Sequence, residues 1–551
     1  MQKSIKCFFF VLDDFPKVWS VLLTNIEKSA LAKNPEIALA ALKSFNDLVN
    51  IPINPALSPS SKKPLIPRDQ QLWQQAWQVW LNIGNGCSRC PPERVIIIDR
   101  YDSNIPSQNF LTFFIDIFPN LINHIWSSDF IHNAKHFEQF STIIERVLAV
   151  PIHSDMALFL IPTDVNLTLL QESAYKAMEF VCKNLKLELT KTTNASALLP
   201  ICFKRLLILV LYAINPPVFD CTEQIKKIPT NKQQSNGKND SNVNFVPFSE
   251  KILRMTISFY EDVADNPAVI ENGTLQTIIQ TLQVPLSMKY NCPSSTTWKL
   301  AIECFFRSLK VGLVVARKHR NAFESMWTEL AKTFDDFLFS KSIPPTDIPI
   351  EELQRDEAID CQAIELIRDD ILPHANVLPE TFITKILNIL NRGSIYSCAT
   401  DNFIDIDSAR RLREEFSKIC FETLLKYSFI NDSSSSNDNL VITRLALSSM
   451  LNRCKEILQK YAHDERLHGK CPLPRPRTAE MISVLKALST LIGALKRAPK
   501  DSVEINIWHQ LIALYPCLVE CTTSPSPQIC NAIKDTLHQY FTLLTPPPSV
   551  R

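Results

Sequence analysis

The residues best suited to chemistry are two cysteines near the N-terminal end of the chain. Cys87-Ser-Arg-Cys90 is the one Cys-x-x-Cys in the sequence, a spacing that occurs in zinc sites and redox pairs. A structural zinc site needs two more ligands at matching spacing, but the next cysteine is Cys182, in a predicted helix. Two prolines follow Cys90, where a redox motif would begin a helix. We therefore interpret Cys87 and Cys90 as ordinary loop cysteines.

Two histidines four residues apart are the second candidate pair. His132 and His136 would share a helix face, but the zinc-protease motif requires glutamate after the first histidine, and Asn133 stands there. We interpret both as solvent-facing helix residues. The sequence has no nucleophile elbow, phosphate-binding loop or dinucleotide fingerprint. It therefore predicts no catalytic, cofactor-binding or metal-binding residue, and a protein that is not an enzyme.

Composition excludes further classes of function. The net charge of +1 gives no support for nucleic acid binding, which usually needs a strongly basic face. The short basic runs at 317–320 and 410–411 are interpreted as solvated helix faces. Only 8 of 551 residues are glycine, far below the usual share of about 7%. Because tight turns and nucleotide-binding loops use glycine, this scarcity argues against β-rich and Rossmann-like folds.

The cysteines and the apolar runs indicate where in the cell the protein is expected. Many of the 16 cysteines occupy apolar helical positions, as reduced cysteines of the cytosol do. The longest apolar run, residues 206–214, has about half the length of a membrane span. We interpret this run as a buried helix, and expect a cytoplasmic protein that can visit membrane surfaces.

Helices must position whatever surface this protein uses, and residues 322–345 show their pattern. Apolar side chains recur there at steps of three and four and therefore lie on one helix face, which Pro344-Pro345 ends. These side chains belong to Phe323, Met326, Trp327, Leu330, Phe334, Phe337 and Leu338. Such a helix buries its stripe only against neighbours of the same kind.

The same pattern recurs along the chain. Helices are predicted over residues 18–31, 35–49, 70–81, 110–126, 132–150, 167–187, 195–213, 249–265, 273–286, 296–318, 323–340, 360–372, 379–391, 408–429, 440–461, 478–496, 504–521 and 528–544. Paired, they have the length of HEAT or armadillo units, although no letter pattern repeats at a fixed period. We predict an all-α, HEAT/armadillo-like superhelix of antiparallel helix pairs. Its parts are a helical-repeat block at 1–225, a disordered linker or loop at 226–246, and a second block at 247–551.

Two surface features have alternative interpretations. Residues 346–370 are acidic and follow a basic stretch that includes Arg307, Lys310 and Arg317. This asymmetry either selects partners or is neutralised within one surface, and we favour neutralisation. Residues 470–477, rich in proline, are either an ordered connector, which we favour, or a ligand for an aromatic-lined groove.

Several long stretches suggest a family. SMKYNCPSSTTWKLAI (287–302, with Met288 where leucine is expected), FDDFLFSKSIPP (334–345), RLREEFSKICFETLL (411–425), DERLHGKCPLPR (464–475) and LIALYPCLVECTTS (511–524) resemble the C-terminal region of the Mon-two (monensin-sensitivity) family. Residues 18–45 resemble the same family. The resemblance spans most of the chain and is strongest after Val246.

The resemblance implies a HEAT/armadillo-type scaffold in Golgi-to-endosome trafficking. The family is similar to the large Sec-seven-type Arf exchange factors but lacks their catalytic domain. It implies a peripheral location on trans-Golgi and endosomal membranes, and three partners: a Dopey-type protein, a phospholipid flippase and an Arf-like GTPase. The family's N-terminal regions have no counterpart here, so we expect a fragment or a short form. The alternative is a cargo-binding solenoid of the nuclear-transport type.

Overall fold

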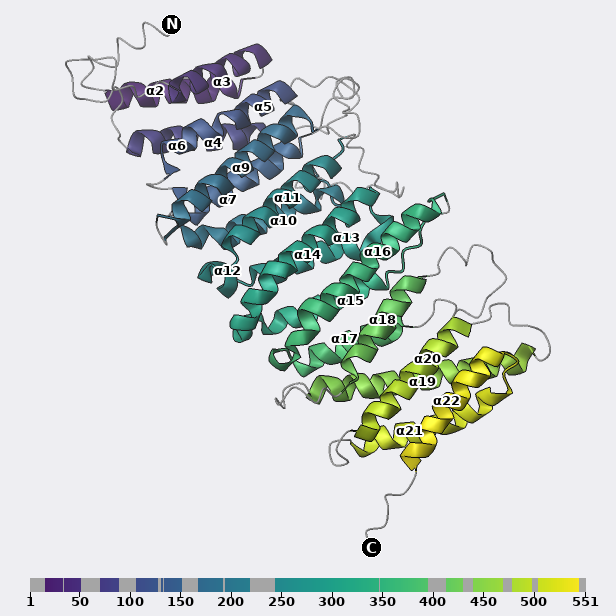
Figure 1. The fold of residues 1–551 in the computed structure, drawn as a ribbon. Coiled ribbons are helices and arrows are strands. Elements are labelled where there is room, and N and C mark those ends of the chain that lie inside the picture. Colours follow the sequence, from purple (N-terminus) through teal and green to yellow (C-terminus); the bar gives the residue numbers. More distant parts are fainter. Residues whose placement is uncertain are drawn as a thin grey trace, which may run out of the picture. The chain divides into compact units, whose positions relative to one another are not determined.

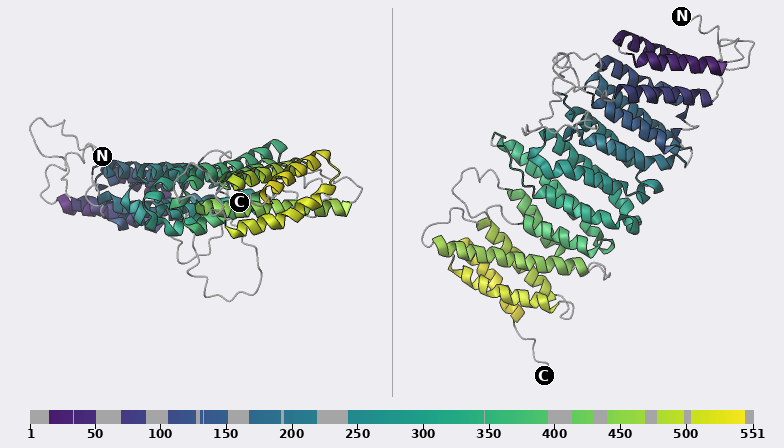
Figure 2. Two further views of the ribbon diagram at one scale, coloured as in Figure 1. Left: turned by 60° about the horizontal axis from the view of Figure 1, so that its bottom comes forward. Right: turned by 180° about the vertical axis from the view of Figure 1, so that it is seen from behind.

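The computed structural model describes residues 15–32, 34–50, 70–88, 106–126, 130–131, 133–150, 167–191, 194–218, 243–345, 347–394, 413–429, 440–468, 478–497 and 504–544. Helices make up the regular structure of these residues, which contain no strand. The chain divides into two compact units, Met1–Val315 and Ala316–Arg551. Each unit stacks antiparallel helix pairs in two layers (Figures 1 and 2). The predicted all-α, HEAT-like class is confirmed.

The first unit contains α2 (Phe15–Ala30), α3 (Pro35–Val49), α4 (Gln70–Cys87), α5 (Gln108–Asp116), α6 (Phe118–Asn123), α7 (Ala134–Leu148), α9 (Leu169–Leu189), α10 (Leu199–Val210), α11 (Val246–Val263), α12 (Pro267–Glu271), α13 (Thr274–Met288) and most of α14 (Ser295–Lys318). Each helix packs against the helix about two places along the chain. Thus α2 contacts α4, α4 contacts α7 and α7 contacts α10, while α3, α5, α9 and α11 form the other layer. Asn34 caps α3, because its side chain accepts hydrogen bonds from the backbone N–H groups of Glu36 and Ile37.

Aromatic side chains fill the centre of this unit. Trp77 stacks on Trp80 at 5.2 Å between ring centroids, and Trp80 stacks on Phe114 at 4.6 Å. Trp73, Trp77 and Trp80 are all buried, as their spacing predicts.

The second unit contains α15 (Glu324–Leu338), α16 (Ile350–Leu366), α17 (Glu380–Gly393), α18 (Glu414–Tyr427), α19 (Leu440–His468), α20 (Thr478–Arg497), α21 (Ile505–Glu520) and α22 (Pro527–Leu544). One layer consists of α15, α17, α19 and α21, each packed on the next. On the other side of the core, α16 packs on α18 and α20 packs on α22. All seven residues of the predicted α15 stripe are buried, which confirms it as core.

Several predicted helix boundaries are wrong, and α19 continues to His468 rather than ending at residue 461. Residues 82–88 were predicted to be irregular, but α4 continues to Cys87. Its Gly84 allows close packing, since a Cβ on this residue would lie 2.8 Å from both Phe114 Cζ and Ile143 Cγ2. Likewise α16 begins at Ile350 rather than at residue 360. Its first turns are acidic and carry no apolar stripe, so periodicity misses them, while Glu351 and Glu352 favour a helix N-terminus.

The predicted division at 226–246 differs from the boundary between the two compact units, which falls within the sequence of α14. Most of the predicted linker lies outside the described residues, but its last residue, Val246, begins α11. Because α10 and α11 pack against each other, the helices on either side of the segment belong to one unit.

Two helical stretches have the length and apolar composition of membrane spans, residues 195–213 and α20. Both also pack in this structure: α10 lies against α7 and α11, and α20 lies against α22. Core helices of helical-repeat proteins pass the same test, so the two stretches give weak support for membrane insertion.

Candidate functional site: a polar groove between two helices

The residues that the sequence offers as candidates for metal binding or catalysis have structural roles where the structure describes them. Cys87 is buried at the end of α4, where its thiol donates to the carbonyl oxygen of Gly84 at 3.5 Å. Burial raises the pKa of this thiol to about 12. A protonated, buried thiol is a poor metal ligand and a poor nucleophile. Cys90 lies outside the described residues.

The histidine pair does not form a site either. His132 lies outside the described residues, while His136 is half-buried, which corrects the predicted solvent-facing position. Its Nδ1 accepts a hydrogen bond from Trp77 Nε1 at 3.2 Å. Within the described ranges, no group of three or more histidine, cysteine or acidic side chains is arranged to hold a metal.

A histidine that sequence analysis passed over is also structural. His124 stacks on Trp73 with 3.6 Å between ring centroids, and its Nε2 lies 3.1 Å from the backbone oxygen of Val49. Burial lowers its pKa below the ordinary histidine value. Its neutral ring therefore packs as an aromatic side chain in the core.

The acidic segment at 346–370 is partly neutralised within its own unit. Asp360, buried in α16, pairs with Arg413 at 2.7 Å, and Asp369 pairs with Arg368 at the same distance. In the basic stretch before it, Arg307 forms a bidentate pair with Glu261 of the first unit. Arg317 donates to the backbone oxygen of Asp370 at 3.2 Å. The pairs of Asp360 and Asp369 agree with partial neutralisation of the acidic segment. Its role in selecting partners stays a prediction.

The second half of the 322–345 segment packs in the core and against neighbouring helices. Its apolar residues Phe334, Phe337 and Leu338 are buried and not available for binding. Its polar face instead joins neighbouring helices, since Asp335 pairs with Arg392 of α17. The 470–477 segment lies outside the described residues.

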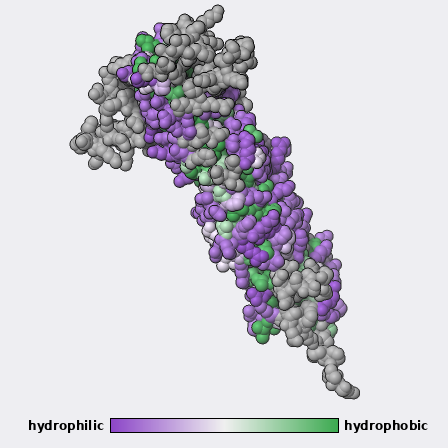
Figure 3. Space-filling view, turned by 90° about the vertical axis from the view of Figure 1, so that its left-hand side faces the viewer, coloured by the Kyte–Doolittle hydropathy of each residue, from purple (hydrophilic) through white to green (hydrophobic). Residues whose placement is uncertain are grey.

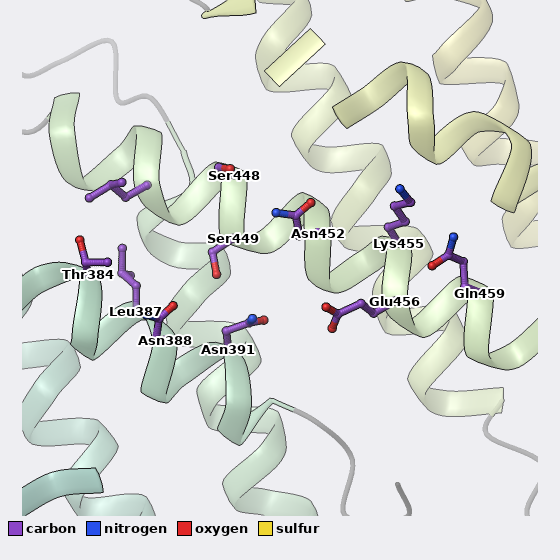
Figure 4. A pocket seen from close by; sticks show the side chains of 11 residues that line it. Thr384, Leu387, Asn388, Asn391, Ser448, Ser449, Asn452, Lys455, Glu456 and Gln459 are labelled. Atoms are coloured by element: carbon purple, nitrogen blue, oxygen red, sulfur yellow. The ribbon is translucent and has the colours of Figure 1, made fainter. Parts of the chain in front are cut away.

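One concave surface among the described residues is a groove in the second unit, between α17 and α19. Its volume is about 500 Å³, and hydroxyl and carboxamide groups dominate its lining. The lining residues are Thr384, Leu387, Asn388, Asn391, Leu445, Ser448, Ser449, Asn452, Lys455, Glu456 and Gln459. Figure 4 shows the carboxamides of α17 extending toward the hydroxyl and amide groups of α19.

Helical periodicity explains why these side chains share a surface. On α19, Leu445, Ser449, Asn452, Glu456 and Gln459 recur at steps of three and four, opposite the face that carries the core residues. From Leu445 to Gln459 the row covers fourteen helical steps, or about 21 Å at 1.5 Å per step. Sequence analysis missed it because it searched for apolar stripes and known motifs. The signal was present as a mainly polar stripe on a long helix, in Ser449, Asn452, Glu456 and Gln459.

Two contacts fix the groove. Arg453, a buried neighbour, donates to Glu456 Oε2 at 2.7 Å and so holds that carboxylate at the rim. Gln510 of α21 donates to Ser448 Oγ, also at 2.7 Å, and links the groove to the next helix of the layer. The buried oxygen Oδ1 of Asn391 accepts no hydrogen bond from the described residues. Buried acceptors are normally paired, so this atom needs an explanation.

Exposed apolar side chains provide a second kind of surface. One face of α21 carries four exposed apolar side chains, those of Ile505, Ile512, Tyr515 and Val519. On α2, Val18 and Val21 are exposed. Elsewhere, the face drawn in Figure 3 is mainly hydrophilic, with apolar side chains in small groups.

The chain matches a known protein family over almost its whole length. The model of the family described as the C-terminal region of Mon2 protein matches residues 4–67 and 60–547. The human Protein MON2 homolog is 40% identical over 588 residues, covering 98% of this chain and 34% of its own length. The Drosophila melanogaster homolog is 37% identical over 573 residues, with the same coverage. The Monensin-resistant homolog 2 of Caenorhabditis elegans is 28% identical, covering 97% of this chain and 34% of its own length.

Solved structures add little to this result. A circular tandem repeat protein covers 96% of this chain and 98% of its own at 10% identity, with a TM-score of 0.25. Importin beta covers 97% and 64% at 9% identity, with a TM-score of 0.21. Such scores carry no argument about fold or function. The chain spans about a third of the length of the curated relatives, and the family match together with 37–40% identity over nearly all of its own length shows that it belongs to the Mon2 family, as a counterpart of its C-terminal region.

Proposed function

We propose that the chain is a non-enzymatic helical-repeat scaffold in protein transport between Golgi and endosomes. The observation that carries the proposal is family membership across almost the whole chain. The stacked helices support it, because such arrays present long side-chain surfaces suited to binding proteins. The described residues contain no metal-binding cluster, and the candidate cysteine is buried and protonated.

The proposed partners are a Dopey-type protein, a phospholipid flippase and an Arf-like GTPase, met at trans-Golgi and endosomal membranes. Peripheral attachment through such partners requires no membrane-spanning segment of this chain. The near-zero net charge agrees with recruitment by proteins rather than by attraction to an anionic lipid surface.

Affinity purification of the tagged full chain from cytosol and membrane fractions, followed by mass spectrometry, tests this function. We expect the membrane fraction to yield Golgi or endosomal proteins, including a Dopey-type partner. A parallel purification with an unrelated helical-repeat protein of similar size provides the control. Recovery of nuclear-transport cargo without any Golgi or endosomal partner would instead support the cargo-binding alternative.

A further inference from the structure

We propose that the groove between α17 and α19 binds the main chain of an extended peptide segment from a partner protein. The inference rests on the proposed scaffold function for its biological purpose, but its chemistry comes from the groove alone. The groove holds at least four carboxamides, on Asn388, Asn391, Asn452 and Gln459. Each carboxamide offers one acceptor and two donor hydrogens, and so can bond a peptide N–H and a peptide C=O together.

The spacing of these groups suits a chain in extended conformation. The α19 row covers about 21 Å, which corresponds to about six residues of extended peptide at roughly 3.3 Å each. A helical ligand would already have used its own N–H and C=O groups and would need a row of apolar contacts, which the groove does not offer. Leu387 and Leu445 are the two apolar lining residues.

The charge and lining of the groove argue against other ligand classes. Lys455 and Glu456 are its two charged residues and have opposite signs, so neither a phosphate nor a nucleic acid is favoured. Small-molecule sites are mostly apolar and enclose their ligand, whereas this groove is lined mainly by polar residues and lies open between two helices. A neutral peptide backbone matches a neutral, hydrogen-bonding groove.

Asn391 is the most informative residue in the groove. Its Oδ1 is buried and has no donor among the described residues. This oxygen has no surface open to the groove, so a peptide N–H can pair with it only once the Asn391 side chain rotates. Asn388 and Asn452 are exposed, so their amides are available for binding without first breaking core packing.

The test uses the purified full chain and a random dodecapeptide library displayed on phage. Selected peptides are synthesised with a fluorescent label, and their dissociation constants are measured by fluorescence polarisation. We expect the double variant Asn388→Ala/Asn452→Ala to weaken binding at least tenfold, and Ser449→Arg, which fills the groove, to abolish it. Asn506→Ala, an exposed asparagine of α21 outside the groove, is the matched control and should leave binding unchanged.

Two further measurements separate binding from structure. Asn391→Leu should leave the thermal unfolding temperature unchanged or higher while weakening the peptide at least fivefold, since a purely structural asparagine would not affect affinity. N-methylation of the peptide backbone should weaken binding at least tenfold, because it removes the donors that carboxamide oxygens accept from.

The proposal is overturned if no peptide is selected, if Ser449→Arg binds the selected peptides normally, or if N-methylation has no effect. It is also overturned if every selected peptide is an apolar helix former that ignores the asparagines. Because the assay uses purified protein and peptides, it can fail while Golgi partners are still recovered from cells. It can equally succeed when those partners are absent.

Discussion

At the end of α4, the thiol of Cys87 is enclosed by the core of the first unit, and its surroundings decide its chemistry. Burial likewise raises the pKa of Cys304, Cys454 and Cys521 to about 12. These cysteines serve as small apolar side chains at helix contacts. The Cys-x-x-Cys spacing alone could not reveal that Cys87 is buried, because spacing along the chain says nothing of which helices pack around it.

Alkylation of the native protein with iodoacetamide at pH 8 should therefore spare Cys87, Cys304 and Cys454. A thiol whose pKa is about 12 is almost entirely protonated at pH 8, and its reactivity should rise about tenfold per pH unit as the thiolate forms. Because the folded pKa lies above the unfolded value of about 8.5, these thiols also stabilise the fold at neutral pH and lose that contribution between about pH 9 and 12. Mass spectrometry of labelled peptides measures this, with urea-unfolded protein as the control. Rapid labelling of native Cys87, or one zinc ion per chain, would restore the reactive interpretation.

The side chain of Trp327 is a second example of a residue whose role follows from its burial. It is buried in α15, and its ring centroid lies 5.1 Å from that of Phe382 in α17. Trp327→Ala should lower the free energy of unfolding by about 3–5 kcal/mol, because it removes a large ring and leaves a cavity between the two helices. Denaturant unfolding followed by circular dichroism measures the loss, and Trp327→Phe should lose less. Unchanged unfolding combined with the loss of a partner would identify the stripe as an interface.

At the scale of helices, a glycine can let two helices pack closely. At the C-terminal end of α17, a Cβ on Gly393 would lie 2.6 Å from Cys420 Sγ and 3.1 Å from Phe416 Cε1, both on α18. In α20, by contrast, a Cβ on Gly493 would meet no atom within 4 Å. Gly393 therefore permits the close contact between α17 and α18, whereas Gly493 has no such role.

These two positions give a matched pair of substitutions. Gly393→Ala should destabilise the protein by about 1–3 kcal/mol, because α17 and α18 must separate. Gly493→Ala should stabilise it by about 0.4–1 kcal/mol, since alanine lowers the entropy of the unfolded chain and nothing obstructs its methyl group. Thermal unfolding of both variants measures the difference in sign. Equal effects would show that the α17–α18 contact is looser than described.

Arg413 shows how a single side chain connects several elements. Its guanidinium reaches Asp360 of α16 at 2.7 Å and the backbone oxygen of Leu338 at the end of α15, also at 2.7 Å. It also lies over the ring of Phe416 at 3.8 Å. The pair contains a buried carboxylate, and removing one partner of such a pair leaves a charge without compensation. Part of the acidic segment at 346–370 therefore holds α16 in place.

At the scale of the whole molecule, stability should be distributed over two units. In helical-repeat proteins each repeat contacts mainly its neighbours, so unfolding need not be one cooperative event. Six of the eight tryptophans lie in the first unit: Trp19, Trp73, Trp77, Trp80, Trp126 and Trp298.

Urea unfolding followed by tryptophan fluorescence should therefore report mainly on the first unit, while circular dichroism reports on the helices of both. We expect the two transitions not to coincide. Trp327→Ala should shift the circular dichroism curve more than the fluorescence curve, because it destabilises the second unit. Coincident curves that shift together would show that the units unfold as one.

The sequence by itself determined the class of fold and most of the helices. Apolar residues at steps of three and four identify a buried helix face wherever the stripe is strong, as in α15, α20 and α22. The same local pattern failed at the acidic start of α16 and at the glycines of α4, where caps and close packing decide the structure. Family membership was also predictable, since it depends on the order of residues alone.

Only the tertiary structure decided which polar residues meet. Asn388 and Asn391 lie more than fifty residues before Asn452 and Gln459, and nothing local connects them. They line one groove because α17 and α19 are neighbours in the same layer. The physical reason is that a helix fixes the direction of its side chains through its own period, whereas the neighbour that those side chains face depends on how the whole stack buries its apolar surface.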